Sequence, residues 1–331
     1  MPARRKGVCV LGAGAWGTAL ALQAARAGTG RVPLWARDPA RAAAIDAARE
    51  NRRHLPGAAL PTAVAVTADL GAALAGAALA VLAIPAQHLR PLLATLPADA
   101  PPLLVVAKGV EAASLKLPLE VAAELRPDLA AAVLSGPNFA HEVAAGLPAA
   151  AVVAGPDAEL RTRAAALLGS PGFRLYGSDD PVGVQVGGAA KNVIAIAAGA
   201  VVGAGLGENA RAALVTRGLA EIARLAAALG GRAETAAGLS GLGDLLLTAT
   251  GPGSRNTSLG VELGRGRRLD EALAGRTGVT EGVATAPALV ARAAGSGVEW
   301  PRCGAVVDLL AGSAGVPEVM ARLLARPRRD E

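Results

Sequence analysis

Aromatic residues and cysteine are scarce in this chain of 331 residues. With two Phe, one Tyr and three Trp, the chain has few aromatic side chains on which single-stranded nucleic acid could stack. Its two cysteines, Cys9 and Cys303, exclude a disulfide framework, and they do not form a pair with metal-ligand spacing. This cysteine usage fits a reducing compartment.

Basic residues outnumber acidic ones, and the formal net charge is +6. The cations cluster in residues 4–6, 265–268 and 322–329. Such clusters can mark a nucleic-acid interface, but without aromatic partners they are better explained as solvated faces and termini. We therefore expect no nucleic-acid partner, whereas a surplus of cations suits a small anionic substrate.

The sequence also lacks an uninterrupted membrane span. The apolar run after Arg4-Arg5-Lys6 mimics a signal peptide, but it contains the glycines of a motif described below. Residues 70–89 have no charged side chain, yet they break at Pro85 and are predicted to form a short helix and then a strand. A spanning helix needs about 20 continuous apolar residues. We expect a cytoplasmic protein without membrane insertion.

Short apolar runs alternate with Ala-rich helical stretches in the first half of the chain. Continuous apolar runs are typical of strands buried on both faces of a parallel sheet, and we expect such strands at residues 7–11, 31–36, 78–84, 103–107, 131–134 and 149–154. Their alternation with helices predicts an α/β fold with a Rossmann-type doubly wound sheet.

The pattern changes near residue 178. Ser178-Asp179-Asp180-Pro181 has the capping residues and proline of a helix start, and helical patterns continue from there to about residue 325. We predict a Rossmann domain at residues 1–178 and an all-helical C-terminal domain at residues 179–331, which would carry the substrate and catalytic groups.

The clearest local motif is Gly12-Ala13-Gly14-Ala15-Trp16-Gly17, which follows the apolar strand at residues 7–11 and opens an Ala/Leu helix. In this context a GxGxxG pattern predicts a dinucleotide site. Gly12 permits the tight turn, Gly14 lets a pyrophosphate approach the backbone, and Gly17 lets the helix pack on the strand. The helix N-terminus offers N–H groups and positive partial charge to the phosphates. The alternative is a purely structural turn.

Arg37 stands where the second strand ends, at the position where an NAD-specific site usually has an acid. Asp38 precedes Pro39 and is interpreted as a helix N-cap. An arginine at the strand end could pair with a 2′-phosphate, so we expect NADPH to be accepted at least as well as NADH. The alternative is an ordinary surface arginine.

Several polar residues occupy positions that suit ligand contact. Lys108 and the segment Gly136-Pro137-Asn138 follow predicted strands, where parallel sheets bind ligands. Lys191 is the only Lys or Arg between residues 175 and 210, on an otherwise apolar helix. A charge there is costly unless it is paired or faces a cavity, although a lysine can also extend to solvent.

Farther on, Gly241-Leu242-Gly243-Asp244 and Gly253-Ser254-Arg255-Asn256 follow. An Arg-Asn pair on a Gly-rich turn suits a phosphate because guanidinium can bind it through two parallel hydrogen bonds. A structural ion pair is the alternative explanation. Of the three histidines, His54 lies in a polar loop near the cofactor motif, and His88 and His141 lack partners at metal spacing. We therefore expect no metal site.

Together these segments resemble the bacterial-type NAD(P)-dependent glycerol-3-phosphate dehydrogenases. The resemblance covers nearly the whole chain in the family's order, through residues 12–19, 34–37, 84–87, 108–111, 135–140, 185–195, 214–221, 241–245, 254–256 and 279–282. It implies reversible hydride transfer between NAD(P)H and dihydroxyacetone phosphate, which supplies sn-glycerol 3-phosphate for phospholipid synthesis.

The resemblance also implies roles for individual residues. Lys191 would be the catalytic proton donor or acceptor, oriented in part by Asp244. The substrate would be surrounded by Lys108, Gly136, Asn138, Lys191, Asp244, Ser254, Arg255 and Asn256. The cofactor would contact the glycines of the motif and Ala15, Trp16, Arg37, His54, Lys108, Ala140, Arg255, Val279 and Glu281.

Two positions depart from the family's commonest pattern: Ala15 stands where Ser is frequent, and Asn138 where Ser or Thr is frequent. Two other functions stay open. A β-hydroxyacid dehydrogenase would share the build, but it favours Asn four and five positions after the lysine, whereas Asn192 directly follows Lys191. A redox sensor would bind the dinucleotide without turnover. The sequence leaves open whether the protein is a homodimer.

Overall fold

The structure is a computed structural model that describes residues 7–251, 253–276 and 278–327. The basic residues at positions 4–6 and the end of the tail, residues 328–331, lie outside the described part. The chain divides into two compact units. The sheet unit contains the chain up to Lys108 and residues 116–185, and the helical unit contains residues 109–115 and 186–331.

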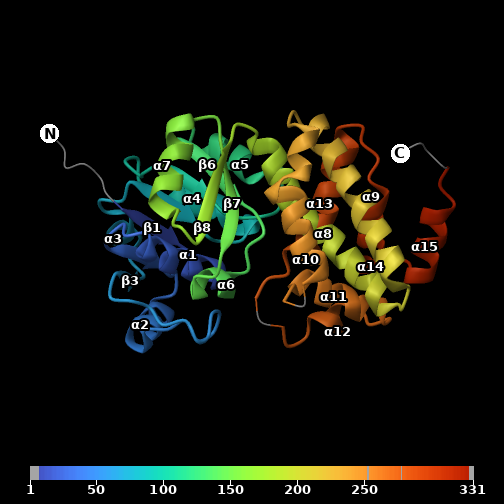
Figure 1. Ribbon diagram of the computed structural model, residues 1–331, viewed down its shortest axis with the longest axis horizontal. Coiled ribbons are helices and arrows are strands. Elements are labelled where there is room, and N and C mark those ends of the chain that lie inside the picture. Colours follow the sequence, from blue (N-terminus) through green and yellow to red (C-terminus); the bar gives the residue numbers. More distant parts are fainter. Residues whose placement is uncertain (1–6, 252, 277, 328–331) are drawn as a thin grey trace. The chain divides into compact units, whose positions relative to one another are not determined.

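The sheet unit is built on one eight-stranded sheet with the strand order β3-β2-β1-β4-β5-β6-β7-β8 (Figure 1). Neighbouring strands run parallel except β6 and β7. The strands are β1 (Val8–Leu11), β2 (Val32–Trp35), β3 (Val64–Thr67), β4 (Leu79–Leu82), β5 (Leu103–Val105), β6 (Ala131–Ser135), β7 (Ala149–Ala154) and β8 (Phe173–Ser178). The predicted Rossmann-type α/β class is confirmed, and six of these strands coincide with predicted ones.

Helices cover both faces of this sheet because successive strand residues point to opposite sides. Val8 and Val10 of β1 belong to a core shared with α1 (Ala15–Arg26), α2 (Pro39–Ala48), α6 (Ala140–Ala145) and α7 (Ala158–Leu168). Cys9 and Leu11 belong to the opposite core, shared with α3 (Leu70–Leu74), α4 (Leu89–Thr95) and α5 (Pro118–Leu125). The strand order reverses at β1, so the loops after β1 and β4 flank the switch point of a doubly wound sheet.

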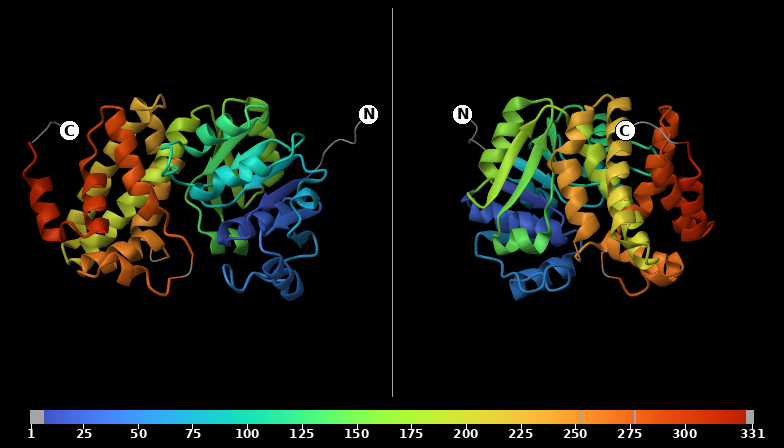
Figure 2. Two further views of the ribbon diagram at one scale, coloured as in Figure 1. Left: turned by 180° about the vertical axis from the view of Figure 1, so that it is seen from behind. Right: turned by 45° about the vertical axis from the view of Figure 1, so that its right-hand side comes forward.

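The described part of the helical unit contains helices and turns, as the ribbon views show (Figure 2). Its long central helix is α8 (Pro181–Gly203), which begins in the last residues of the sheet unit. It is followed by α9 (Gly207–Ala228), the 3-10 helix η2 (Ala233–Ala237), the π-helix η3 (Leu239–Gly243), α10 (Asp244–Thr250), α11 (Arg255–Gly264), α12 (Leu269–Leu273), α13 (Glu281–Gly295), α14 (Pro301–Ala311) and α15 (Val316–Leu324). The predicted start of α8 is confirmed, since Asp180 accepts a hydrogen bond from the Gly183 N–H at 2.8 Å. The division into two domains at residue 178 stays a prediction.

Glycines let α8 and α11 cross at backbone contact. A Cβ added to Gly199 would lie 2.1 Å from the Thr257 carbonyl oxygen, and one added to Gly260 would lie 2.0 Å from the Ile196 carbonyl oxygen. Neither position has room for a side chain. The two helices are therefore held in one register, which fixes polar residues of α8 against the first turn of α11.

One described helix, α8, is long and apolar enough to cross a membrane by length and composition. In the protein, 89% of its apolar window is buried. Burial of this kind is what the core helix of a helical domain requires.

Candidate active site

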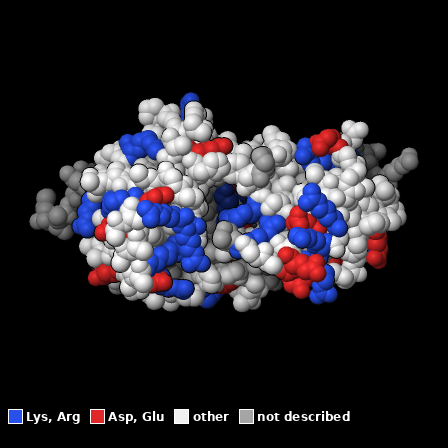
Figure 3. All heavy atoms as spheres, turned by 90° about the horizontal axis from the view of Figure 1, so that it is seen from below, with Lys and Arg blue, Asp and Glu red and all other residues white. Residues whose placement is uncertain are grey.

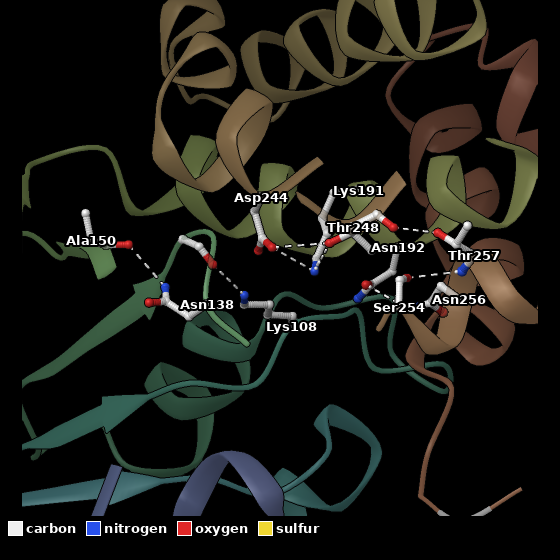
Figure 4. Close-up of polar contacts among 11 residues, drawn as sticks. Lys108, Asn138, Ala150, Lys191, Asn192, Asp244, Thr248, Ser254, Asn256 and Thr257 are labelled. Atoms are coloured by element: carbon white, nitrogen blue, oxygen red, sulfur yellow. Dashed lines mark hydrogen bonds and ion pairs between the residues drawn. The ribbon is translucent and has the colours of Figure 1, made fainter. Parts of the chain in front are cut away.

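Lys191 forms a buried ion pair in the helical unit. Its Nζ donates to Asp244 Oδ1 at 2.9 Å and to Thr248 Oγ1 at 2.8 Å (Figure 4). The side chains of Lys191 and Asp244 are 10% and 2% exposed. The lysine is thus buried and paired rather than extended into solvent. Burying two charges costs several kcal/mol per ion unless hydrogen bonds satisfy both, so this pair is weak evidence for stability and better evidence for function.

Local backbone geometry brings Asp244 to α8. The π-helix η3 ends at Gly243, directly before Asp244, and π-helical turns occur often at functional sites. Gly241 has no room for a side chain, because a Cβ there would lie 2.0 Å from the Ala236 carbonyl oxygen. Gly187 of α8 faces the same turn, with its Cβ position 3.1 Å from the Ser240 carbonyl oxygen. Gly187 therefore lets α8 approach η3, and Gly241 lets η3 pack against η2, directly before Asp244.

A second polar network joins α8 to the start of α11. Asn256 Nδ2 donates to Asn192 Oδ1 at 2.8 Å, and the Gly282 N–H donates to Asn256 Oδ1 at 3.1 Å. Ser254 caps α11 by accepting from the Thr257 N–H at 3.1 Å. The sequence predicts that Arg255 and Asn256 lie on a Gly-rich turn. That placement is wrong, because both residues belong to the first turn of α11, with Ser254 as its N-cap.

Arg255 extends from this helix start toward solvent. It is exposed, and no ion pair joins it to a carboxylate in the described part of the chain. Its guanidinium lies beside Gly278, next to Val279. Arg276 also reaches this helix start, donating to the Arg255 carbonyl oxygen at 3.2 Å. A helix N-terminus with two arginines is suited to an anion such as phosphate.

In the sheet unit, Lys108 and Asn138 lie at the carboxyl ends of neighbouring strands. Lys108, which follows β5, donates from Nζ to the Gly136 carbonyl oxygen at 3.0 Å. Asn138, which follows β6, donates to the Ala150 carbonyl oxygen at 3.2 Å, while its buried Oδ1 has no hydrogen-bond partner in the described chain. Figure 4 shows both contacts. A buried polar atom without a partner is uncommon and marks a place where a ligand can bind.

The three glycines of the turn after β1 differ in whether the surrounding protein leaves room for a side chain. Gly12 has φ +123°, and a Cβ there would lie 2.4 Å from the Ala83 carbonyl oxygen. A Cβ on Gly17 would lie 1.9 Å from the Gly12 carbonyl oxygen, so Gly17 lets α1 pack on the turn. Gly14 has an ordinary φ of −77°, and a Cβ there would meet nothing within 4 Å. The protein's own packing therefore does not require glycine at position 14. A ligand lying against the backbone there would require it.

Cations gather beside this turn. Arg37 is exposed two residues after the end of β2, and Arg41 lies one turn farther along, in α2. Burial lowers the pKa of Arg41 below its usual value, and the nearby positive charge of Arg53 lowers it further. Figure 3, which views the molecule from the α2 side of the sheet unit, shows Lys and Arg side chains clustered on this face. Repulsion among such cations would be relieved by a bound phosphate.

Comparisons with known proteins agree with this architecture. Residues 7–161 match the family model described as NAD-dependent glycerol-3-phosphate dehydrogenase N-terminus, and residues 180–321 match the model of its C-terminus. Relatives named glycerol-3-phosphate dehydrogenase, NAD(P)+, come from Acidiphilium cryptum, 56% identical over 79% of both chains, and Rhodospirillum rubrum, 52% identical over 80% of this chain and 77% of the relative. The crystal structure of glycerol-3-phosphate dehydrogenase from Coxiella burnetii has a TM-score of 0.93 and 35% identity, covering 97% of this chain and 99% of that one.

The chain belongs to the NAD-dependent glycerol-3-phosphate dehydrogenase family. The predicted family membership is confirmed.

The residues that the family resemblance predicts for the site are distributed over both units. In the helical unit, Lys191 contacts Asp244, and Ser254, Arg255 and Asn256 adjoin one another at the start of α11. Val279 and Glu281 flank the start of α13. In the sheet unit, the predicted positions are the Gly12–Gly17 turn, Arg37, His54 in the loop after α2, Lys108, Gly136, Asn138 and Ala140, the first residue of α6. The roles of these residues stay predictions.

The structure adds residues to which sequence reasoning gave no role. Thr248 holds the Lys191 ammonium together with Asp244, and it stands four residues after Asp244, one helical turn along α10. Asn192 positions Asn256. The four-residue spacing between Asp244 and Thr248 could have predicted that the two side chains share one helix face. The pairing of Asn192 with Asn256 could not be predicted in this way, because it depends on how the helices pack. Among the described residues, no group of three or more His, Cys, Asp or Glu could hold a metal ion.

Proposed function

We propose that the protein is an NAD(P)-dependent sn-glycerol-3-phosphate dehydrogenase that reduces dihydroxyacetone phosphate reversibly and supplies glycerol 3-phosphate for phospholipid synthesis. The observation that carries this proposal is the buried cluster of Lys191, Asp244 and Thr248. Folding alone does not require an ion pair at this place. The same unit also presents the arginines at the start of α11. Family membership supports the same activity.

Lys191 serves as the proton donor in ketone reduction. When bound, a reduced nicotinamide supplies a hydride to C2 of the substrate, and negative charge then develops on the C2 oxygen. Asp244 and Thr248 accept hydrogen bonds from this ammonium, and these two contacts fix its position in the site. A donor aimed in advance at the developing charge is the main source of rate acceleration in such sites. Oxidation of glycerol 3-phosphate needs the neutral amine, so its rate should rise toward alkaline pH.

Arg255 and Asn256 hold the substrate phosphate at the start of α11. The guanidinium offers two parallel N–H donors, and the first turn of the helix adds backbone N–H groups and positive partial charge. The Asn256–Asn192 hydrogen bond ties this phosphate site to the residue next to Lys191. The distance between the bound phosphate and the proton donor is thereby fixed within one rigid group of helices.

The residues of the sheet unit fit a nicotinamide dinucleotide. The pyrophosphate would lie against Gly14, where the absence of a side chain leaves open space, and against the N–H groups of Ala15 and Trp16. Trp16 Nε1 is buried without an acceptor in the described chain. Arg37 and its neighbouring cations would bind a 2′-phosphate, so NADPH should be accepted at least as well as NADH.

We further propose that the enzyme is cytoplasmic, takes a small-molecule substrate, binds no nucleic acid and is not inserted in a membrane. The 89% burial of the apolar window in α8 supports the last point. A homodimer stays a hypothesis that light scattering on the purified protein tests.

The proposed activity is tested by following NADPH absorbance after addition of dihydroxyacetone phosphate. We expect oxidation of NADPH that depends on this substrate, and no oxidation with a β-hydroxyacid dehydrogenase substrate such as a short β-ketoacid. Turnover of the ketoacid alone would favour the β-hydroxyacid dehydrogenase function. Binding of NADPH without turnover of either compound would favour a redox sensor.

A further inference from the structure

The Gly-rich turn after β1 is held in place by a residue outside the motif. Asn51 lies in the loop between α2 and β3 and is 1% exposed. Its Nδ2 donates to the Ala13 carbonyl oxygen at 2.9 Å and to Thr18 Oγ1 at 2.8 Å. Thr18 Oγ1 in turn donates to the Gly14 carbonyl oxygen at 2.8 Å. The buried Asn51 amide thus fixes two successive carbonyl groups of the turn, that of Ala13 directly and that of Gly14 through Thr18.

Arg41 adds a second donor to the same carbonyl. From α2, it donates to the Ala13 carbonyl oxygen, so this oxygen accepts hydrogen bonds from two side chains. The Asn51 backbone carbonyl accepts from the N–H groups of His54 and Leu55, at 3.1 and 2.8 Å, which fixes the loop that carries the Asn51 side chain.

These contacts determine where the N–H groups of the turn point. In a trans peptide the N–H and C=O point in opposite directions. With the Ala13 and Gly14 carbonyls held by Asn51, Arg41 and Thr18, the N–H groups of Gly14 and Ala15 must point the other way. Gly14 is the N-cap residue of α1, and this N-terminus receives no hydrogen bond from an N-cap side chain. The turn is therefore locked with its donors turned away from the protein contacts, before any ligand arrives.

We propose that Asn51 is a positioning residue for the cofactor pyrophosphate, acting through the Ala13 carbonyl, with Arg41 and Thr18 completing the support. The proposal rests on the proposed dehydrogenase function for the identity of the ligand. Asn51 Oδ1 and Arg41 Nε are buried and have no hydrogen-bond partner in the described chain. Packing alone would not retain two unsatisfied polar groups at one turn, because a buried polar group without a partner is costly.

This role predicts a distinct pattern of cofactor selectivity. The pyrophosphate is common to NADH and NADPH, so loss of the Asn51 amide should weaken both cofactors by the same factor. Loss of Arg37, at the proposed 2′-phosphate site, should weaken binding of NADPH more than binding of NADH. The ratio of the two dissociation constants therefore separates support of the turn from recognition of the 2′-phosphate.

The test compares Asn51→Ala with Gln23→Ala as a matched control. Gln23 is also a buried amide, 2% exposed, and it donates to a backbone carbonyl, that of Leu168, at 2.8 Å. It lies on α1 but takes no part in the network at the turn. Fluorescence titration of each purified protein with NADPH and with NADH gives Kd directly, without turnover, and thermal unfolding gives the stability of the same samples.

We expect Asn51→Ala to raise both Kd values about tenfold, the equivalent of one lost buried hydrogen bond. Gln23→Ala should lower thermal stability comparably but leave both Kd values within twofold of wild type. Asn51→Asp, which keeps the shape but places an oxygen against the Ala13 carbonyl, should weaken binding at least as much. Thr18→Val should also weaken both cofactors, whereas Thr18→Ser keeps the hydroxyl and should restore binding.

Equal Kd values for Asn51→Ala and Gln23→Ala would overturn the proposal, as would a loss confined to NADPH. These outcomes are distinct from failure of the dehydrogenase function. If the wild-type protein binds NADPH but does not oxidise it with dihydroxyacetone phosphate, the proposed function fails, and the Kd comparison still decides the role of Asn51.

Discussion

Replacing Gly14 by alanine should abolish tight cofactor binding while leaving the protein folded. The φ of −77° at this position is ordinary for alanine, and a Cβ there would meet nothing within 4 Å. The substitution reduces the entropy of the unfolded chain, a gain of about 0.4–1 kcal/mol. It also exchanges glycine for a poorer N-cap residue at the start of α1, a loss of up to about 1 kcal/mol. These two effects nearly cancel.

The added methyl group would occupy the space through which a pyrophosphate approaches the backbone. Displacing the phosphate should weaken charge-assisted hydrogen bonds to the N–H groups of Ala15 and Trp16, each contributing about 1.5–3 kcal/mol. Loss of a single such bond corresponds to at least about a tenfold increase in Kd. Loss of both would exceed a hundredfold.

Gly17→Ala is the informative contrast. Its Cβ would lie 1.9 Å from the Gly12 carbonyl oxygen, so α1 would have to move, at a cost of about 1–3 kcal/mol or more. Denaturant unfolding and NADPH titration of both variants should therefore separate a binding defect from a folding defect. A folded Gly14→Ala protein that binds NADPH with wild-type affinity would refute the assignment of the open space at Gly14 to the pyrophosphate.

Four further substitutions test other parts of the molecule. Arg37→Ala should raise KM for NADPH more than for NADH; equal losses in the two assays would mean that Arg37 does not touch the 2′-phosphate. Arg255→Lys should raise KM for dihydroxyacetone phosphate strongly, because a bidentate fork becomes a point charge, and unchanged kinetics would remove this residue from the phosphate site. Gly260→Ala should lower the free energy of unfolding by about 1–3 kcal/mol, because its Cβ would lie 2.0 Å from a carbonyl oxygen of α8. Gly304→Ala, in an α14 position with nothing within 4 Å, should instead raise it by about 0.5–1 kcal/mol. Chemical denaturation compares the two glycine variants, and equal effects would contradict the close helix crossing.

The interior of the sheet was predictable because its strands are apolar on both faces. β1 and β4, for example, are buried at every position and appear in the sequence as continuous apolar runs. The two outermost strands, β3 and β8, were missed. In β8 most residues are at least partly exposed, and the strand contains Arg174 and Gly177, so it lacks the continuous run on which the prediction depended. An edge strand has fewer neighbours to bury it, and its sequence carries a weaker signal.

The residues of the candidate site were likewise predictable only in part. Lys191 could be singled out because a lone charge on a long apolar helix needs a partner, and that partner is Asp244. The role of Asn51 could not be predicted, because its contact with Ala13 joins residues 38 positions apart through the packing of a loop. Residues that act through a neighbour leave little trace in local patterns, whereas residues that violate a local rule stand out.

The central claim, that Lys191 donates the proton in ketone reduction, is tested most directly by kcat of Lys191→Ala with NADPH and dihydroxyacetone phosphate both saturating. Removing Lys191 leaves Asp244 buried without its counter-ion, at a cost of about 3–5 kcal/mol, so the assay must run below the unfolding transition of the variant. We predict a fall in kcat of at least about 10²–10⁴-fold with an unchanged Kd for NADPH, since the Gly12–Gly17 turn is untouched. A folded Lys191→Ala protein with near-normal kcat would contradict the mechanism.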